Sequence, residues 1–138
     1  YAYLGDSRLQ VIFLSRYISS MNKQLELVKE FHKKFDVPIL PSPRGSIDRA
    51  RFDLRYKLML EEIHEYLIGA QSWDIHNIAK ELSDLLYSLY GTVLEHWLQD
   101  VFDQVFEEVH RSHMSKDYHE FKMVKWDNYF KADLKKVF

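Results

Sequence analysis

The chain has 138 residues, of which 46% are hydrophobic and 29% charged, a composition that suits one globular domain and excludes a disordered protein. It contains no cysteine, which excludes a disulfide framework and a zinc-thiolate site. The formal net charge of −2 combines an acidic body with a basic tail after about residue 110. An acidic body suits cations and argues against nucleic acid as a partner, whereas a basic tail could fold over an anionic ligand.

Residues 1–20 carry only a weak helical stripe, and we expect them to form an extension before the domain. Residues 11–14 are the longest apolar run in this part of the chain, and Arg16 interrupts it before it could serve as a signal or membrane segment. We therefore expect a cytoplasmic protein without a membrane partner.

Long stretches of period-3.6 patterning, with only four glycines and three prolines, predict an all-α domain over residues 21–138. The first helix is expected around Leu25 to Phe35, before a proline-rich loop at residues 38–43. Three further helices are expected to run from an N-cap residue to an approximate end: Ser46 to Gly69, Asp74 to Trp97 and Asp100 to His113. From about residue 114 the chain lacks clear periodicity, which predicts a partly ordered tail.

Two acidic motifs lie on the second and third predicted helices, Glu61-Glu62-x-x-Glu65 and Glu81-x-x-Asp84. Residues three apart on an α-helix lie on one face, so each motif forms a pair of carboxylates that can grip one ion. Mg²⁺ prefers carboxylate and water oxygens and usually leaves positions open for substrate phosphates. The motifs therefore indicate a Mg²⁺ site, with Mn²⁺ as a possible substitute.

A helical wheel gives both helices the same layout, with the carboxylates about 100° to 160° from the apolar stripe in the same rotational sense. This layout fits a shared carboxylate-lined groove, but it also fits two ordinary amphipathic helices with solvated acidic faces. Small residues at Ser88, Gly91 and Thr92 would leave room for a ligand or a partner helix. Arg55 lies two turns before Glu62, where it could reach a phosphate, hold a carboxylate or form an ordinary helix ion pair.

A di-iron site is a competing interpretation, because Glu61-x-x-His64 and Glu107-x-x-His110 match the Glu-x-x-His element of ferritin-like bundles. In that fold the ligands project into the bundle core, yet these four side chains point away from the apolar stripes. The wheel therefore disfavours di-iron, although it does not by itself favour Mg²⁺.

The spacing of the two acidic motifs, fifteen residues apart, resembles the signature of the all-α nucleoside triphosphate pyrophosphatases, the MazG and phosphoribosyl-ATP pyrophosphohydrolase superfamily. Residues 27–32, 86–92, 108–116 and 128–137 resemble one branch of it, the phosphoribosyl-ATP-pyrophosphohydrolase-like proteins. The resemblance implies a four-to-five-helix bundle of the MazG type. A homodimer or homotetramer is expected, since four helices in so small a domain leave much apolar surface exposed.

By this resemblance, the metal ligands would be Glu62, Glu65, Glu81 and Asp84. Glu61 would orient or deprotonate the attacking water, and Lys116 would contact the triphosphate. The chain departs from the branch at His113, where asparagine is usual, and in residues 117–127, which look shorter. A histidine can still donate one hydrogen bond to a phosphate, so the site would be altered rather than lost.

The implied reaction is Mg²⁺-dependent hydrolysis of a nucleoside triphosphate between its α- and β-phosphates. Hydrolysis of phosphoribosyl-ATP in histidine biosynthesis is the alternative reaction, and a non-catalytic helical interaction module is the alternative without chemistry. His32 and Trp73 are candidates for contacting the base, whereas Phe31 and Phe35 are expected in the core. Trp73 is the more informative of the two, because it lies in the short connection between the acidic helices.

Overall fold

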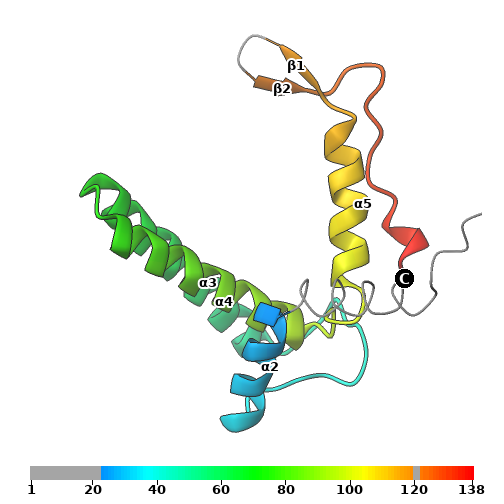
Figure 1. Cartoon of the computed structure of the whole chain (residues 1–138). Coiled ribbons are helices and arrows are strands. Elements are labelled where there is room, and N and C mark those ends of the chain that lie inside the picture. The colour runs from blue at the N-terminus through cyan, green and yellow to red at the C-terminus, as the bar shows by residue number, and fades with distance from the viewer. Residues whose placement is uncertain (1–22, 120–121) are drawn as a thin grey trace, which may run out of the picture. The chain divides into compact units, whose positions relative to one another are not determined.

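The computed structural model describes residues 23–119 and 122–138, so the predicted N-terminal extension lies outside the described residues. The described chain is mostly helical, which confirms the all-α prediction. Its helices are α2 (Lys23–Lys34), α3 (Arg49–Gln71), α4 (Ile75–Glu95) and α5 (Phe102–Met114) (Figure 1). The chain divides into two compact units, Tyr1–Trp97 and Leu98–Phe138, which are described separately. None of the described helices is long and apolar enough to cross a lipid bilayer.

Helix α3 begins and ends about two residues later than predicted. Asp48, not Ser46, is its N-cap, because the Asp48 carboxylate accepts a hydrogen bond of 2.9 Å from the Ala50 N–H. Gly69 is not the C-cap and lies inside the helix, where a Cβ atom would stand 2.8 Å from the side-chain nitrogen of Asn77 on α4. Its lack of a side chain therefore serves the close approach of α4.

The N-cap prediction is confirmed for α4 and wrong for α5. The Asp74 carboxylate accepts hydrogen bonds from His76 N (3.0 Å) and Asn77 N (3.2 Å). Helix α5 starts one residue after Val101, which makes no side-chain capping bond, so Asp100 is not the cap. An aspartate thus caps a helix only where its carboxylate accepts a hydrogen bond from a backbone N–H of the first turn.

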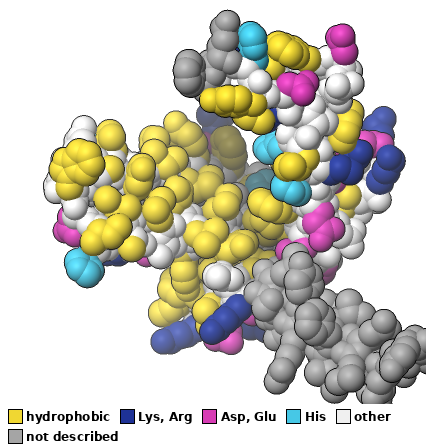
Figure 2. Space-filling model, turned by 45° about the horizontal axis from the view of Figure 1, so that its top comes forward, with side chains coloured by type: hydrophobic (Ala, Val, Ile, Leu, Met, Phe, Trp, Pro, Cys, Tyr) yellow, Lys and Arg dark blue, Asp and Glu magenta, His cyan; other side chains and the backbone are white. Residues whose placement is uncertain are grey.

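In the first unit, α3 and α4 form a long antiparallel pair and α2 packs against α4 (Figure 1). The buried hydrophobic side chains of the described residues are few: Leu25, Val28, Val93 and Leu94. The apolar stripes of α3 and α4 are largely outside this core, since Phe52 is 56% exposed, Ile63 50% and Leu82 47%. Figure 2 shows hydrophobic side chains gathered over the helix pair.

In the second unit, the tail after α5 is more ordered than predicted. Strands β1 (Asp117–His119) and β2 (Lys122–Val124) form an antiparallel hairpin, and the 3₁₀-helix η1 (Leu134–Lys136) follows near the end. Ser112 Oγ donates a hydrogen bond of 2.8 Å to Phe130 O, and Asp133 N donates one of 2.7 Å to the Glu108 carboxylate. Polar side chains of α5 thus hold the returning chain in place, which helical periodicity cannot reveal.

Candidate functional site

The acidic motifs meet where α3 and α4 pack together. Glu62, Glu81 and Asp84 each offer one carboxylate oxygen, and these oxygens all lie within 4.8 Å of one another. Glu81 is buried, whereas Glu62 and Asp84 are half-buried. We call these three residues, with the neighbouring Glu65, the acidic cluster. Their spacing along the two helices puts them on the facing sides of the pair, which the sequence alone left open.

The acidic cluster carries mutual repulsion. Burial is the main cause that raises the pKa of Glu62, and the charges of Asp84, Glu65 and Glu81 add to it. The pKa of Glu65 is raised chiefly by its side-chain hydrogen bond with Glu81, and the charge of Glu81 adds to the effect. A hydrogen bond between two carboxyl groups requires a proton on one of them, so the cluster favours binding of a positive charge.

Lys80 supplies part of that charge. Its ammonium lies 3.0 Å from both oxygens of Glu81 and 2.9 Å from Asp84 Oδ2, and these bonds raise its pKa. Lys80 was not among the predicted site residues, although its separation of four residues from Asp84 is the spacing of a helix ion pair. One ammonium leaves a net negative charge on the cluster, because Glu62 and Glu65 remain.

The dimensions of the acidic cluster suit a small divalent cation. Octahedral Mg²⁺ holds its oxygens at about 2.0–2.1 Å, which places neighbouring ligands roughly 2.9 Å apart and opposite ligands roughly 4.2 Å apart. The three carboxylate oxygens lie within 4.8 Å of one another, so they would move closer together to bind one ion. Glu62, Glu81 and Asp84 could therefore hold the ion with Glu65 as a further ligand, and Glu61 is exposed beside them on α3.

Arg55 occupies the space that the small residues of α4 leave. Its side chain donates hydrogen bonds to Thr92 Oγ1 at 3.1 Å and to Ser88 O at 2.5 Å, and the residue is only 7% exposed. A Cβ atom at Gly91 would collide with the guanidinium. The room at these positions thus accommodates an arginine of α3 and not a ligand.

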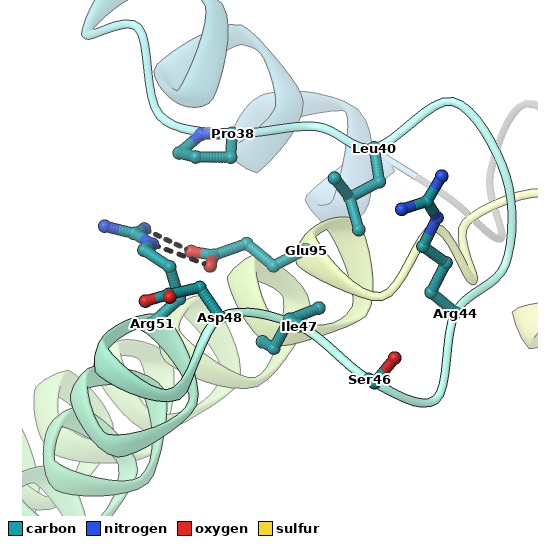
Figure 3. A pocket seen from close by; sticks show the side chains of 8 residues that line it. All are labelled: Pro38, Leu40, Arg44, Ser46, Ile47, Asp48, Arg51 and Glu95. Carbon is teal, nitrogen blue, oxygen red and sulfur yellow. Dashed lines mark hydrogen bonds and ion pairs between the residues drawn. The ribbon is translucent and has the colours of Figure 1, made fainter.

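Glu95 is the centre of a second, buried ionic group at the other end of the helix pair. Arg51 donates two hydrogen bonds to its carboxylate, at 3.0 and 2.5 Å (Figure 3). Arg55 Nη1 lies 3.6 Å from the same carboxylate. His32 is 2% exposed and contacts Pro38 O through Nδ1 at 3.2 Å, and burial lowers its pKa. Glu95 lies fourteen residues beyond Glu81, about 21 Å along α4, so this group is separate from the acidic cluster.

Two of the cavities that the described residues line belong to the first unit. One, of about 320 Å³, opens above the Arg51–Glu95 pair and is lined by Pro38, Leu40, Arg44, Ser46, Ile47, Asp48, Arg51 and Glu95 (Figure 3). The other, of about 250 Å³, lies between α2 and α4 and is lined by Gln24, Leu27, Val28, Ser83, Leu86, Tyr87 and Tyr90. Ser83, the residue before Asp84, lines the second cavity together with the aromatic side chains of Tyr87 and Tyr90.

The remaining residues that the sequence predicts to contact the substrate, and one aromatic residue expected in the core, lie at or near the surface. Trp73 is 90% exposed in the turn between α3 and α4 and holds a left-handed backbone, φ 58°. Phe31, expected in the core, is 42% exposed, and its ring meets Tyr87 edge-on with centroids 5.5 Å apart. His113 is exposed in the last turn of α5, and Lys116 follows that helix half-buried. These last two residues belong to the second unit.

A family model described as phosphoribosyl-ATP pyrophosphohydrolase matches residues 28–113. The match spans both acidic motifs and covers more than half of the chain. No curated protein matches the sequence at a significant level.

Proposed function

The chain belongs to the phosphoribosyl-ATP pyrophosphohydrolase family, within the MazG-like all-α superfamily, and we propose that it hydrolyses a nucleoside triphosphate between the α- and β-phosphates. Membership supports a nucleotide pyrophosphohydrolase-type activity. The products would be a nucleoside monophosphate and pyrophosphate. The single observation that carries the proposal is the meeting of Glu62, Glu81 and Asp84 at the contact of two helices inside the matched region.

The acidic cluster would hold Mg²⁺, or Mn²⁺ in its place. The bound ion would neutralise phosphate charge and lower the pKa of a bound water. Glu81 provides a fixed ligand, because burial between the helices restricts its side chain. The side chain of Lys80 is 60% exposed, so it can leave the carboxylates when a stronger cation binds and pair with a phosphate instead.

Glu61 is the proposed acceptor of the proton from the attacking water. It is exposed and its charge acts on Glu65, so it borders the acidic cluster without being one of the three converging ligands. A carboxylate in that position can orient a water molecule and take its proton as the bond to phosphorus forms. Lys116 and His113 are proposed to contact phosphates, and Trp73 to stack on the base.

Arg55 and His32 are left out of the proposed substrate contacts. Arg55 is engaged by Ser88, Thr92 and Glu95, and His32 is buried against Pro38. Their polar groups hold the far end of the helix pair together.

A panel of ribo- and deoxyribonucleoside triphosphates with Mg²⁺, scored for pyrophosphate against orthophosphate, tests the proposal. Phosphoribosyl-ATP belongs in the panel, because the description of the matching family favours it as a second candidate substrate. Pyrophosphate is the expected product in either case. Orthophosphate as the primary product would refute cleavage between the α- and β-phosphates.

Two conservative variants separate an enzyme from a non-catalytic helical module. Glu62→Gln and Asp84→Asn keep the size of each side chain while removing a ligand charge. We expect both to lose nearly all turnover with the helical circular dichroism unchanged. Unchanged turnover in both variants would mean that the acidic cluster is not the site of reaction.

A further inference from the structure

A cavity at the far end of the helix pair is not used by the proposed reaction. It measures about 320 Å³ and opens beside the Arg51–Glu95 pair. We call it the loop cavity, because residues 38–48, which lead from α2 into α3, form most of its wall. Glu95 lies about 21 Å along α4 from Glu81, so a ligand in the loop cavity would not contact the acidic cluster.

Hydrogen bonds hold the loop in place at two points beside the cavity. The buried His32 donates through Nδ1 to Pro38 O at 3.2 Å. Further along, Arg44 N donates to His96 O at 3.1 Å, and His96 Nδ1 donates to Arg44 O at 2.8 Å. Residues 38–43 contain three prolines, which restrict the backbone between these two points. The loop cavity is therefore formed before any ligand binds, as most small-molecule sites are.

The walls of the loop cavity combine apolar and charged side chains. Figure 3 shows Pro38 and Leu40 on one arm of the loop and Ile47 on the other, with the Arg51–Glu95 pair between the arms. Apolar walls with a few placed polar groups are the usual construction of a small-molecule site. The loop cavity therefore suits a compact ligand with an apolar body.

The charges around the loop cavity leave an excess of positive charge. Glu95 is buried, and its carboxylate accepts both hydrogen bonds from Arg51 while Arg55 lies 3.6 Å from it. Arg44 adds a third guanidinium group to the cavity, and Asp48 adds a second carboxylate. Three positive groups against two negative ones leave a net charge of about +1, which buried surroundings screen less than water does. The charge therefore favours an anionic ligand.

Two of these arginines have donors left for such a ligand. Arg51 uses Nε and Nη2 on Glu95, and no acceptor among the described residues bonds to its Nη1. Its side chain is 32% exposed, so this edge of the guanidinium is accessible. The exposed guanidinium of Arg44 likewise makes no hydrogen bond or ion pair within the described part of the chain. A guanidinium presents its N–H groups in a planar fork that matches a carboxylate or a phosphate.

We propose that the loop cavity binds a small organic anion, with its carboxylate or phosphate group on Arg44 and Arg51 and a short apolar body against Pro38, Leu40 and Ile47. A cavity of about 150 Å³ is enough for a benzene ring, so the loop cavity has room for a ring of that size together with a charged group. A bare inorganic anion would leave the apolar walls uncovered. A cation would meet the excess positive charge.

The test is a titration of the full chain without Mg²⁺, followed in ¹H–¹⁵N NMR spectra. Without the metal the acidic cluster repels anions, so binding there does not compete. Phenyl phosphate and phenylacetate are the test compounds, inorganic phosphate supplies the charge without a body, and phenylacetamide supplies the body without a charge. We expect both organic anions to shift the amide signals of Leu40, Arg44 and Ile47 with a dissociation constant of about 1 mM or below. The two neutral or bodiless compounds should bind at least about fivefold more weakly.

Arg44→Gln tests the role of the guanidinium without disturbing the fold, because its side chain holds no other described group. It should weaken the binding of both organic anions at least about fivefold. Arg49→Gln is the matched control, since it removes the same charge from a side chain that is 91% exposed, lies on the first turn of α3 and does not line the cavity. It should leave the dissociation constants unchanged.

Three results would overturn the proposal. The first is the absence of saturable shifts at the loop residues with either organic anion up to about 10 mM. The second is an equal loss of affinity in Arg44→Gln and Arg49→Gln, which would reduce the binding to diffuse charge attraction. The third is inorganic phosphate binding as tightly as phenyl phosphate. None of these results bears on the proposed reaction, which rests on the acidic cluster.

Discussion

Substitution of Glu62 by glutamine should stabilise the metal-free protein and weaken the stabilisation that Mg²⁺ confers. Burial and the charges of Asp84, Glu65 and Glu81 raise the pKa of Glu62, so its ionised form is disfavoured in the fold at neutral pH. This destabilisation of the fold should disappear as the pH falls through the raised pKa of Glu62 and its carboxylate becomes protonated. Removing the charge should therefore stabilise the metal-free protein by roughly 0.5–1 kcal/mol. That corresponds to about 2–4 °C in melting temperature for a chain of this length.

With Mg²⁺ the unsubstituted protein should gain more stability than the variant, so the difference between the two should shrink or vanish. At 10 mM Mg²⁺ and a dissociation constant on the order of 1 mM, binding to the folded state adds about 1.4 kcal/mol of stability. The unsubstituted protein should then melt roughly 5 °C higher. A tenfold weaker site in Glu62→Gln would gain only about 0.4 kcal/mol, or roughly 2 °C.

Thermal melts followed by circular dichroism at several Mg²⁺ concentrations measure this difference. Glu61→Gln is the matched control, because it makes the same change of charge one residue away on an exposed side chain. It should keep the full Mg²⁺ shift while turnover falls, in line with a role in handling water. The reasoning would be refuted by equal Mg²⁺ shifts in the two variants, or by the absence of a shift in the unsubstituted protein.

Three further predictions concern the remainder of the fold. Glu95→Gln should destabilise the protein by about 3 kcal/mol in urea unfolding, since it leaves Arg51 and Arg55 without the carboxylate that they share; a loss below 1 kcal/mol would contradict this role. Trp73→Gly should raise the free energy of unfolding by about 1 kcal/mol by relieving the left-handed backbone, while raising KM if the indole stacks on the base. Glu108, whose pKa is lowered to about 2 by Arg111 and by the Asp133 N–H, should titrate near that value in NMR spectra. Because the folded pKa is depressed, its stabilising contribution is present above the unfolded value near 4.5 and should be lost as the pH falls towards 2, a dependence that Glu108→Gln should abolish.

Local rules predicted the helices well, because helix formation depends on neighbours a few residues away. Periodicity located all four described helices, and Asp74 was identified as the N-cap of α4. The errors lie where tertiary contacts decide. Gly69 lies inside α3, where its lack of a side chain makes room for Asn77 of α4. The tail is ordered by hydrogen bonds that join Ser112 to Phe130 and Glu108 to Asp133.

The acidic residues were predicted individually, whereas the helical wheel left their meeting in a shared groove as one of two interpretations. A helical wheel assigns the apolar stripe to the interior, and on that basis Glu65 and Asp84 pointed away from the core. The structure instead packs α3 on α4 through charged and small side chains, among them Arg55 and Gly91. A helical wheel misses such a contact, because it assigns the interior side of each helix from the apolar stripe alone.

The ammonium of Lys80 gives the proposed metal site a built-in competitor. Since it binds the same oxygens of Glu81 and Asp84 that an ion would need, a cation must displace it before it gains two of its ligands. The affinity of the site for Mg²⁺ would therefore be lower than that of carboxylates without a competing cation, and its occupancy would follow changes in the concentration of free Mg²⁺. On depletion of Mg²⁺, the ammonium of Lys80 would bind the carboxylates again. A chelator should thus stop turnover reversibly while the helices stay paired.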